Sequence, residues 1–148
     1  MVNRKLHPKK FFTEEEKERI VQAIHEAERQ TSGEIRVYLE SQAKGHLMER
    51  AKKIFEKLGM TKTRHQNGVL IYFSLLGHSF AVLGDRGIHE KVGDNFWKEI
   101  VSVMEESFSR EEFASGIIQA IRKAGEKLKK YFPHEKGDLN ELPDEIGG

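Results

Sequence analysis

The sequence predicts an α/β/α sandwich, in which helices cover a small mixed β-sheet. Three observations lead to this fold class. Helical and extended patterns alternate along the chain. The apolar run over residues 69–76 is hydrophobic on both faces, as a central strand is. A short Gly-His-Ser turn follows this run, so the next strand is expected to be its antiparallel hairpin partner.

The first half of the chain predicts a helix, a strand and a second helix. Thr13 and Glu16 have the spacing of a capping box, and apolar residues then recur at helical spacing over residues 14–29. The segment "EIRVYLE" over residues 34–40 alternates between apolar and polar, which is typical of a half-buried strand. A second helical stripe covers residues 47–58. Because a helix separates this strand from the next, the two strands are expected to be parallel.

The second half of the chain predicts a hairpin and two further helices. Residues 69–76 are expected to pair antiparallel with residues 80–84, which makes the second strand the centre of the sheet. Two helical stripes follow the hairpin. We expect one α/β domain over residues 13–132 and an irregular tail over residues 133–148 that adds little to the core.

The composition excludes several classes of protein. The chain has 148 residues, of which 37% are hydrophobic and 33% charged, with a formal net charge of +1. This balance describes a globular domain and argues against nucleic acid as a partner. The absence of cysteine removes disulfides and thiolate metal sites. No apolar run reaches the roughly 20 residues that span a bilayer, and no export signal is evident, so we expect a cytoplasmic protein without a membrane span.

The stretch "LGDRGIHEKVGDNFW" over residues 83–97 carries the polar residues that suggest a site. The third strand runs opposite to the first two, so its end at Asp85 returns to the edge where they begin. Asp85 and Asp94 are therefore expected to meet Glu34 at that edge, with Asn67 beside them. Oxygen ligands of this kind suit Ca²⁺ or Mg²⁺. We interpret Asp85, Asp94 and Glu34 as ligands of one divalent cation.

Other polar residues of the same edge are candidates for phosphate binding or for supporting the metal ligands. Arg86 is suited to bind a phosphate or a carboxylate. His89 is suited to act as a general acid or base. Asn67 and Glu90 complete this group of candidates.

Each of these residues also has a purely structural interpretation. Asp94 stands where the N-cap of the next helix belongs. Asp85 and Asn67 lie beside glycines and suit turns. Arg86 has Glu90 as a possible ion-pair partner. The sequence contains no Walker-type loop, EF-hand, HExxH zinc motif or GxSxG nucleophile elbow, so no other known chemistry replaces these interpretations.

Three segments together resemble the TPM domain family: "TSGEIRVYLE", "NGVLIYFSLLGHSFAVLGDRGIHEKVGDNFW" and "FSREEFASGIIQAI". The resemblance implies an α/β/α sandwich and binding of a divalent cation, often calcium. It also implies an acid phosphatase activity that is reported for some members. Asp85 and Asp94 match the family's acidic loop, and Glu34 matches the acid that opens its first strand. The family's usual Gly-aromatic-Gly in this loop is replaced here by "GDRG".

Three functional hypotheses follow. The first is a divalent-cation-binding domain, with Ca²⁺ or Mg²⁺ as its ligand and a binding or regulatory role towards an unidentified protein. The second is a metal-assisted phosphatase, in which Asp85 or Asp94 binds the cation and Arg86 holds the phosphate of a phosphomonoester. The third is a protein-interaction module without metal, in which the acids act only as helix caps.

Overall fold

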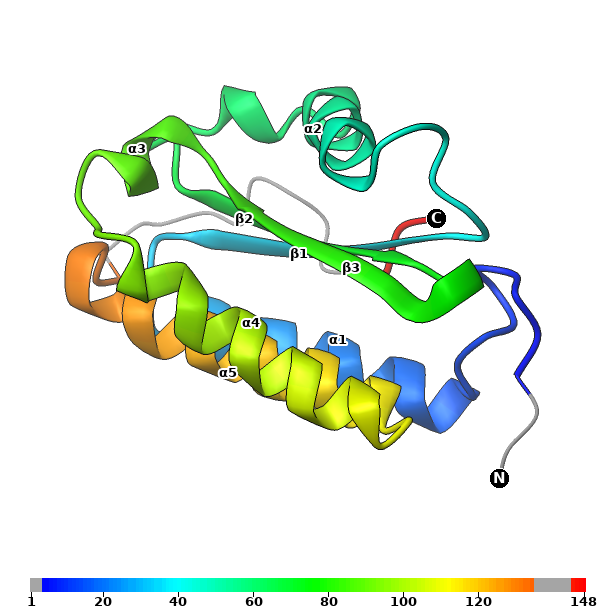
Figure 1. Cartoon of the computed structure of the whole chain (residues 1–148). Helices are drawn as coiled ribbons and strands as arrows, with labels where there is room; N and C mark the ends of the chain where they lie inside the picture. Colours follow the sequence, from blue (N-terminus) through cyan, green and yellow to red (C-terminus); the bar gives the residue numbers. More distant parts are fainter. Residues whose placement is uncertain (1–3, 135–144) are drawn as a thin grey trace.

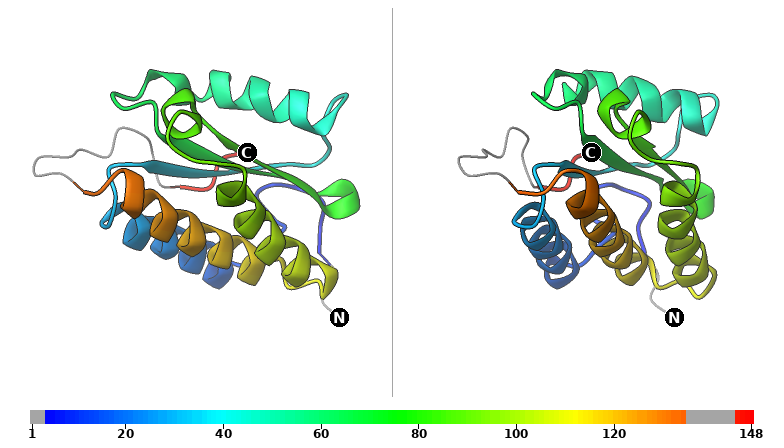
Figure 2. Two further views of the ribbon diagram at one scale, coloured as in Figure 1. Left: turned by 60° about the vertical axis from the view of Figure 1, so that its left-hand side comes forward. Right: turned by 90° about the vertical axis from the view of Figure 1, so that its left-hand side faces the viewer.

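The computed structural model describes residues 4–134 and 145–148 of the chain. A three-stranded sheet lies between two layers of helices (Figure 1), which confirms the predicted α/β/α sandwich. Figure 2 shows from two further sides that α2 covers one face of the sheet, whereas α1, α4 and α5 cover the other. The elements in chain order are α1 (Glu14–Glu28), β1 (Glu34–Glu40), α2 (Leu47–Lys57), η1 (Met60–Lys62), β2 (Gly68–Ser74), η2 (Leu76–His78), β3 (Ser79–Gly84), α3 (Arg86–His89), α4 (Asn95–Ser109) and α5 (Phe113–Tyr131).

The sheet has the order β1-β2-β3, so the predicted central position of β2 is confirmed. β1 and β2 are parallel, and Glu34 lies opposite Gly68 at the start of the pair. β2 and β3 are antiparallel, and Val69 lies opposite Gly84 at the same end of the sheet. All seven residues of β2 are buried, as expected of an apolar strand that is covered on both faces.

Two hydrophobic clusters occupy the two faces of the sheet. The larger contains Ile35, Val37 and Leu39 of β1 with the apolar stripes of α1, α4 and α5, so the alternation predicted for β1 is confirmed. The smaller contains Leu70 and Tyr72 of β2 with the apolar face of α2. The face of β1 that points towards α2 is polar and carries Glu34, Arg36, Tyr38 and Glu40.

The predicted capping box at the start of α1 is present. The Glu16 backbone N–H donates to Thr13 Oγ1 at 3.1 Å, and the Thr13 backbone N–H donates to Glu16 Oε1 at 3.0 Å. Arg4 joins them, because its Nη1 and Nη2 donate to the Glu16 carboxylate at 2.7 and 2.9 Å. This arginine holds the pKa of the Glu16 carboxyl below its usual value. The N-terminal segment is thereby fixed to the first turn of α1.

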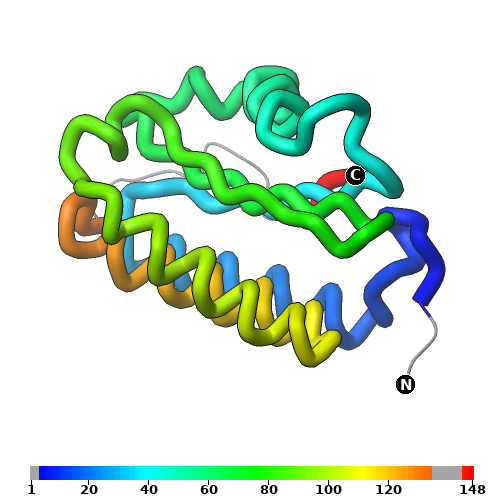
Figure 3. Tube along the Cα trace, in the orientation of Figure 1, coloured from blue at the N-terminus to red at the C-terminus, as the bar shows by residue number. Residues whose placement is uncertain are grey.

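Two features were not predicted. The stretch expected to be a loop contains a short helix, α3, directly after β3. Part of the tail, residues 135–144, lies outside the described residues. Residues 145–148, however, lie beside β1 (Figure 3), and Tyr38 and Gly147 form a parallel bridge. Ile146 packs against the larger hydrophobic cluster, so the tail, which is expected to add little to the core, contributes this side chain to it.

The described residues were also searched for membrane-spanning helices. Among them, no helix is both long enough and apolar enough to cross a bilayer.

Candidate functional site

The starts of β1 and β2 and the end of β3 share one edge of the sheet. The Glu34 backbone N–H donates to the Asn67 carbonyl at 3.4 Å, and the Asp85 backbone N–H donates to the Gly68 carbonyl at 3.0 Å. The structure therefore brings Glu34, Asn67 and Asp85 together, although they are far apart in the sequence. In Figure 1 this edge is the end of the sheet beside α3.

Glu34 and Asn67 are buried polar side chains. Only 4% of Glu34 and 1% of Asn67 is exposed, so Glu34 is not an ordinary solvent-exposed residue at the start of a strand. Asn67 Nδ2 donates to Ser32 Oγ at 3.3 Å. This hydrogen bond uses the amide nitrogen of Asn67 and does not involve its amide oxygen. Burial of an acid and an amide at a strand end costs free energy unless their oxygens are compensated.

Asp85 is the N-cap of α3. Its Oδ1 accepts from the Arg86 backbone N–H at 2.7 Å, and its carbonyl accepts from the Ile88 backbone N–H at 3.1 Å. Its second carboxylate oxygen, Oδ2, is buried and has no hydrogen-bond partner within the part of the chain that the structure describes. Asp85 therefore combines the structural role of a cap with one oxygen whose burial the cap does not explain.

Asp94 has a different environment. It precedes α4 and is exposed, with helical backbone angles of φ −60° and ψ −31°. Its side chain makes no capping hydrogen bond, so the cap interpretation of Asp94 lacks its defining contact. In the ranges 4–134 and 145–148, no three His, Asp or Glu side chains are grouped as ligands of one metal ion.

The remaining predicted residues lie on α3 or directly after it. Arg86, His89 and Glu90 are exposed, and no ion pair joins Arg86 to Glu90 among the described residues. The His89 ring lies 5.4 Å from the Trp97 ring. His89 thus contacts the start of α4, and its exposed imidazole remains accessible to solvent.

Glycines allow this loop to pack closely. The Gly87 backbone N–H donates to the Gln66 carbonyl at 2.8 Å, and a Cβ on Gly87 would overlap the His65 carbonyl oxygen. A Cβ on Gly84 would overlap the Trp97 ring. The glycines therefore hold α3 against residues 65–67, and this contact places Asp85 beside Asn67.

A pocket of about 380 Å³ opens at the same end of the molecule. It is lined by Ser32, Arg64, His65, Glu90, Lys91 and Tyr131, among others. The sequence reasoning missed Arg64, His65 and Lys91, although "TRH" directly before the Asn67 turn was a visible basic cluster. Lys91 is held over the Phe132 ring at 4.6 Å from Nζ to the ring centre. The pocket therefore has three basic residues in its lining, together with Glu90, and lies at the same end of the sheet as Glu34 and Asp85.

A second ionic cluster lies at the opposite end of the sheet. Arg50 of α2 donates twice to Glu40 of β1, and Tyr72 Oη donates to Glu40 Oε1 at 2.6 Å. The Arg50 guanidinium lowers the pKa of the Glu40 carboxyl, whereas burial raises the pKa of the Tyr72 hydroxyl. All three groups satisfy one another, so this cluster fixes α2 to the sheet.

Comparisons with known proteins point to one family. The sequence model of the TPM domain matches residues 7–127. The NMR structure of the BA42 protein from the psychrophilic bacterium Bizionia argentinensis is similar to this chain, with a TM-score of 0.89 and 43% sequence identity. The similarity covers 93% of this chain and 94% of BA42. A comparison with curated proteins gave no match.

Proposed function

The chain belongs to the TPM domain family, and from this premise we propose that it binds a divalent cation, Ca²⁺ or Mg²⁺, at the sheet edge beside Asp85. The observation that carries the proposal is the buried Oδ2 of Asp85, which has no hydrogen-bond partner among the described residues. A buried carboxylate oxygen without a partner is costly, and a bound cation compensates it.

The donor set fits a hard cation. The carboxylates of Asp85 and Glu34 and the amide oxygen of Asn67 provide oxygen ligands at one edge. Asp94 is proposed as a further ligand that comes from the connection between α3 and α4. Ca²⁺ and Mg²⁺ both accept such oxygens and complete their coordination with carbonyl groups and water. With few protein ligands, we expect modest affinity, which suits a binding or regulatory role.

Thermal unfolding with and without cation tests the proposal. Calcium or magnesium in excess should raise the Tm of the wild type, because binding to the folded state stabilises it by about 2.7 kcal/mol at 100 times Kd. Asp85→Asn should lose most of this rise. Asparagine caps helices about as well as aspartate, so α3 should remain intact in this variant. Asp94→Asn and Glu34→Gln should each reduce the rise.

A control variant and a direct fluorescence measurement complete the experiment. Glu105→Gln removes an exposed acid of α4, outside the edge, and should respond to cation as the wild type does. Trp97 is the single tryptophan and packs beside Gly84 and His89, so its fluorescence reports on the edge directly. Equal responses of wild type and Asp85→Asn, or no response at millimolar cation, would refute the proposal and favour an interaction module without metal.

Metal-assisted hydrolysis of phosphomonoesters is the second candidate function. The pocket at the same end of the sheet favours it, because Arg64, His65 and Lys91 in its lining suit an anionic ligand. A bound cation would polarise the phosphate and lower the pKa of a water molecule. Arg86 is exposed on α3 and is proposed to hold the phosphate from the opposite side.

Turnover of an aryl phosphate separates this candidate from simple binding. If the chain is a phosphatase, Asp85→Asn should lower kcat/KM at least tenfold, and Lys91→Ala should raise KM. Lys98→Ala, an exposed lysine of α4 that does not line the pocket, is the matched control. Turnover that is the same in wild type and Asp85→Asn preparations would indicate a contaminating phosphatase and exclude this candidate.

A further inference from the structure

The outer edge of β1 is closed by groups from outside the sheet. The Ile35 backbone N–H donates to Glu28 Oε2 at 3.0 Å. The Gly147 backbone N–H donates to the Val37 carbonyl at 2.9 Å, and the Leu39 backbone N–H donates to the Gly147 carbonyl at 3.0 Å. Gly147 therefore forms an isolated parallel bridge with Tyr38 at the outer edge of β1.

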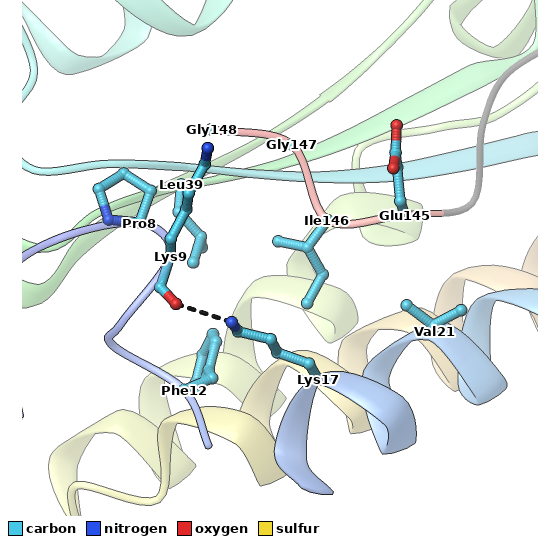
Figure 4. Close-up of a pocket in the computed structure, with 10 residues that line it drawn as sticks. All are labelled: Pro8, Lys9, Phe12, Lys17, Val21, Leu39, Glu145, Ile146, Gly147 and Gly148. Carbon is cyan, nitrogen blue, oxygen red and sulfur yellow. Dashed lines mark hydrogen bonds between the residues drawn. The ribbon is translucent and has the colours of Figure 1, made fainter. Parts of the chain in front are cut away.

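This segment also lines a pocket between β1 and α1. Figure 4 shows Ile146 pointing from the segment towards α1, with Phe12 on one side and Val21 on the other. A pocket of about 250 Å³ with a mainly apolar lining lies beside it, and Ile146, Gly147 and Gly148 form part of the pocket wall. Lys9 and Lys17 lie at its rim, where Lys17 Nζ donates to the Lys9 carbonyl at 2.7 Å. The pocket is thus mainly apolar, with Lys9 and Lys17 on one side and Glu145 on the other.

The two glycines after Ile146 pack closely against residues of β1 and of the N-terminal segment. A Cβ on Gly147 would lie 2.6 Å from Tyr38 Cδ2. Gly148 has φ +136°, and a Cβ there would overlap the Leu39 carbonyl oxygen. Both positions therefore require glycine, so the edge selects side-chain size as well as backbone conformation.

We propose that the edge of β1 and this pocket form a docking groove for an extended peptide with the pattern acidic–apolar–Gly–Gly. The chain's own segment, residues 145–148, occupies this groove in cis. A peptide of the same pattern, supplied by another molecule, replaces it by strand addition. Backbone hydrogen bonds to Val37 and Leu39 provide affinity, and the Ile146 pocket with the two glycine positions provides specificity.

Tethering decides which occupant is bound. A segment on the same chain has an effective concentration of about millimolar, so a free peptide competes with it only at similar concentrations. Weakening the cis segment should therefore make the groove available to a peptide in trans. The proposal is independent of the cation site, which lies at the start of β1 and does not include residues 145–148.

The experiment uses the full chain with Gly147→Val, which introduces a Cβ against Tyr38. Hydrogen exchange of the Leu39 amide, followed by NMR, should be at least tenfold faster than in the wild type. The peptide Asp-Glu-Ile-Gly-Gly should then restore protection of Leu39 in a saturable manner. The wild type should need at least tenfold more peptide for the same chemical-shift change.

Matched controls identify the cause of each effect. Gly93→Val introduces the same side chain where a Cβ has nothing within 4 Å, and Leu39 exchange should not change. The peptide Asp-Glu-Ile-Val-Gly should not bind, because its valine meets Tyr38. If Gly147→Val unfolds the chain, Ile146→Ala provides a milder variant with the same expected exchange and rescue.

Two results would overturn the proposal. Wild-type protection of Leu39 in both variants would show that the segment does not occupy the edge. An opened edge that binds neither peptide, or binds both peptides equally, would show that the groove has no selectivity for glycine. Rescue by the Gly-Gly peptide alone would support the groove.

Discussion

Glu40 of β1 and Arg50 of α2 are joined by two hydrogen bonds, 2.8 Å from Nε to Oε1 and 2.6 Å from Nη2 to Oε2. Both side chains are about four-fifths buried, with 18% of Glu40 and 21% of Arg50 exposed. Charge-assisted hydrogen bonds in such surroundings contribute about 1.5–3 kcal/mol. Glu40→Gln should therefore lower the free energy of unfolding by about 1–2 kcal/mol near neutral pH, as measured by urea denaturation.

This difference should depend on pH in one direction. The pKa of Glu40 in the folded state is lowered from its ordinary value of 4.5, chiefly by the hydrogen bond from Arg50. The contribution of Glu40 is then complete above this ordinary value and is lost as the pH falls through the lowered pKa. Wild type and Glu40→Gln should converge in acid. The exposed pair of Glu106 and Arg110 is the control, because an exposed ion pair contributes little and Glu106→Gln should change stability much less than Glu40→Gln does.

Gly125 of α5 allows the close approach of α1. A Cβ on Gly125 would lie 2.8 Å from Ala27 Cβ and 3.2 Å from Ala27 Cα. Gly125→Ala gains about 1 kcal/mol of helix propensity but forces the two helices apart, so we expect net destabilisation of about 1–2 kcal/mol. The double variant with Ala27→Gly should recover part of this loss. A denaturation midpoint of Gly125→Ala above that of the wild type would contradict the close packing.

Loss of the capping box of α1 is expected to have a smaller effect on stability. Thr13→Ala removes the side-chain oxygen that accepts from the Glu16 backbone N–H, and it should cost about 1 kcal/mol. Thr13→Ser keeps this acceptor and should unfold at nearly the same urea concentration as the wild type. A difference between Ser and wild type as large as that of Ala would assign the effect to the lost methyl group.

Gly84 and Trp97 couple the end of β3 to the start of α4. Gly84→Ala places a methyl group against the Trp97 ring, so the ring must move, at a cost of about 1–3 kcal/mol. The fluorescence emission of Trp97 should shift in the native state. Gly93→Ala is the control, since a Cβ at Gly93 meets open space. Unchanged emission in Gly84→Ala would show that Trp97 does not pack on this glycine.

The sheet could be predicted because the sequence pattern of each strand matches the faces of that strand that are buried. The run of apolar residues in β2 required cover on both faces, and the short turn after it required a hairpin. The helix α3 could not be predicted in the same way. It has four residues, too few for an apolar period, and Gly87 lies inside it. It depends on the hydrogen bond from Gly87 to Gln66, a contact between distant segments.

The same distinction holds for the candidate site. The directions of the strands follow from the order of the elements along the chain, and these directions alone place Glu34 and Asp85 at one edge of the sheet. Lys91 and Tyr131 line the neighbouring pocket because α5 ends where α3 ends. That proximity depends on how the helices pack on the sheet. The spacing of apolar residues predicts which face of each helix is buried, but it does not predict where the helices lie relative to one another.

The central position of β2 in the sheet also affects how the chain folds during its synthesis. β1 carries Ile35, Val37 and Leu39, and its pairing partner lies 34 positions later in the parallel register. At translation rates of about 5–20 residues per second, β1 waits a few seconds before β2 is made. During this time its apolar face has only α1 to cover it, so the nascent chain exposes an unpaired strand that chaperones can bind and that neighbouring nascent chains can pair with.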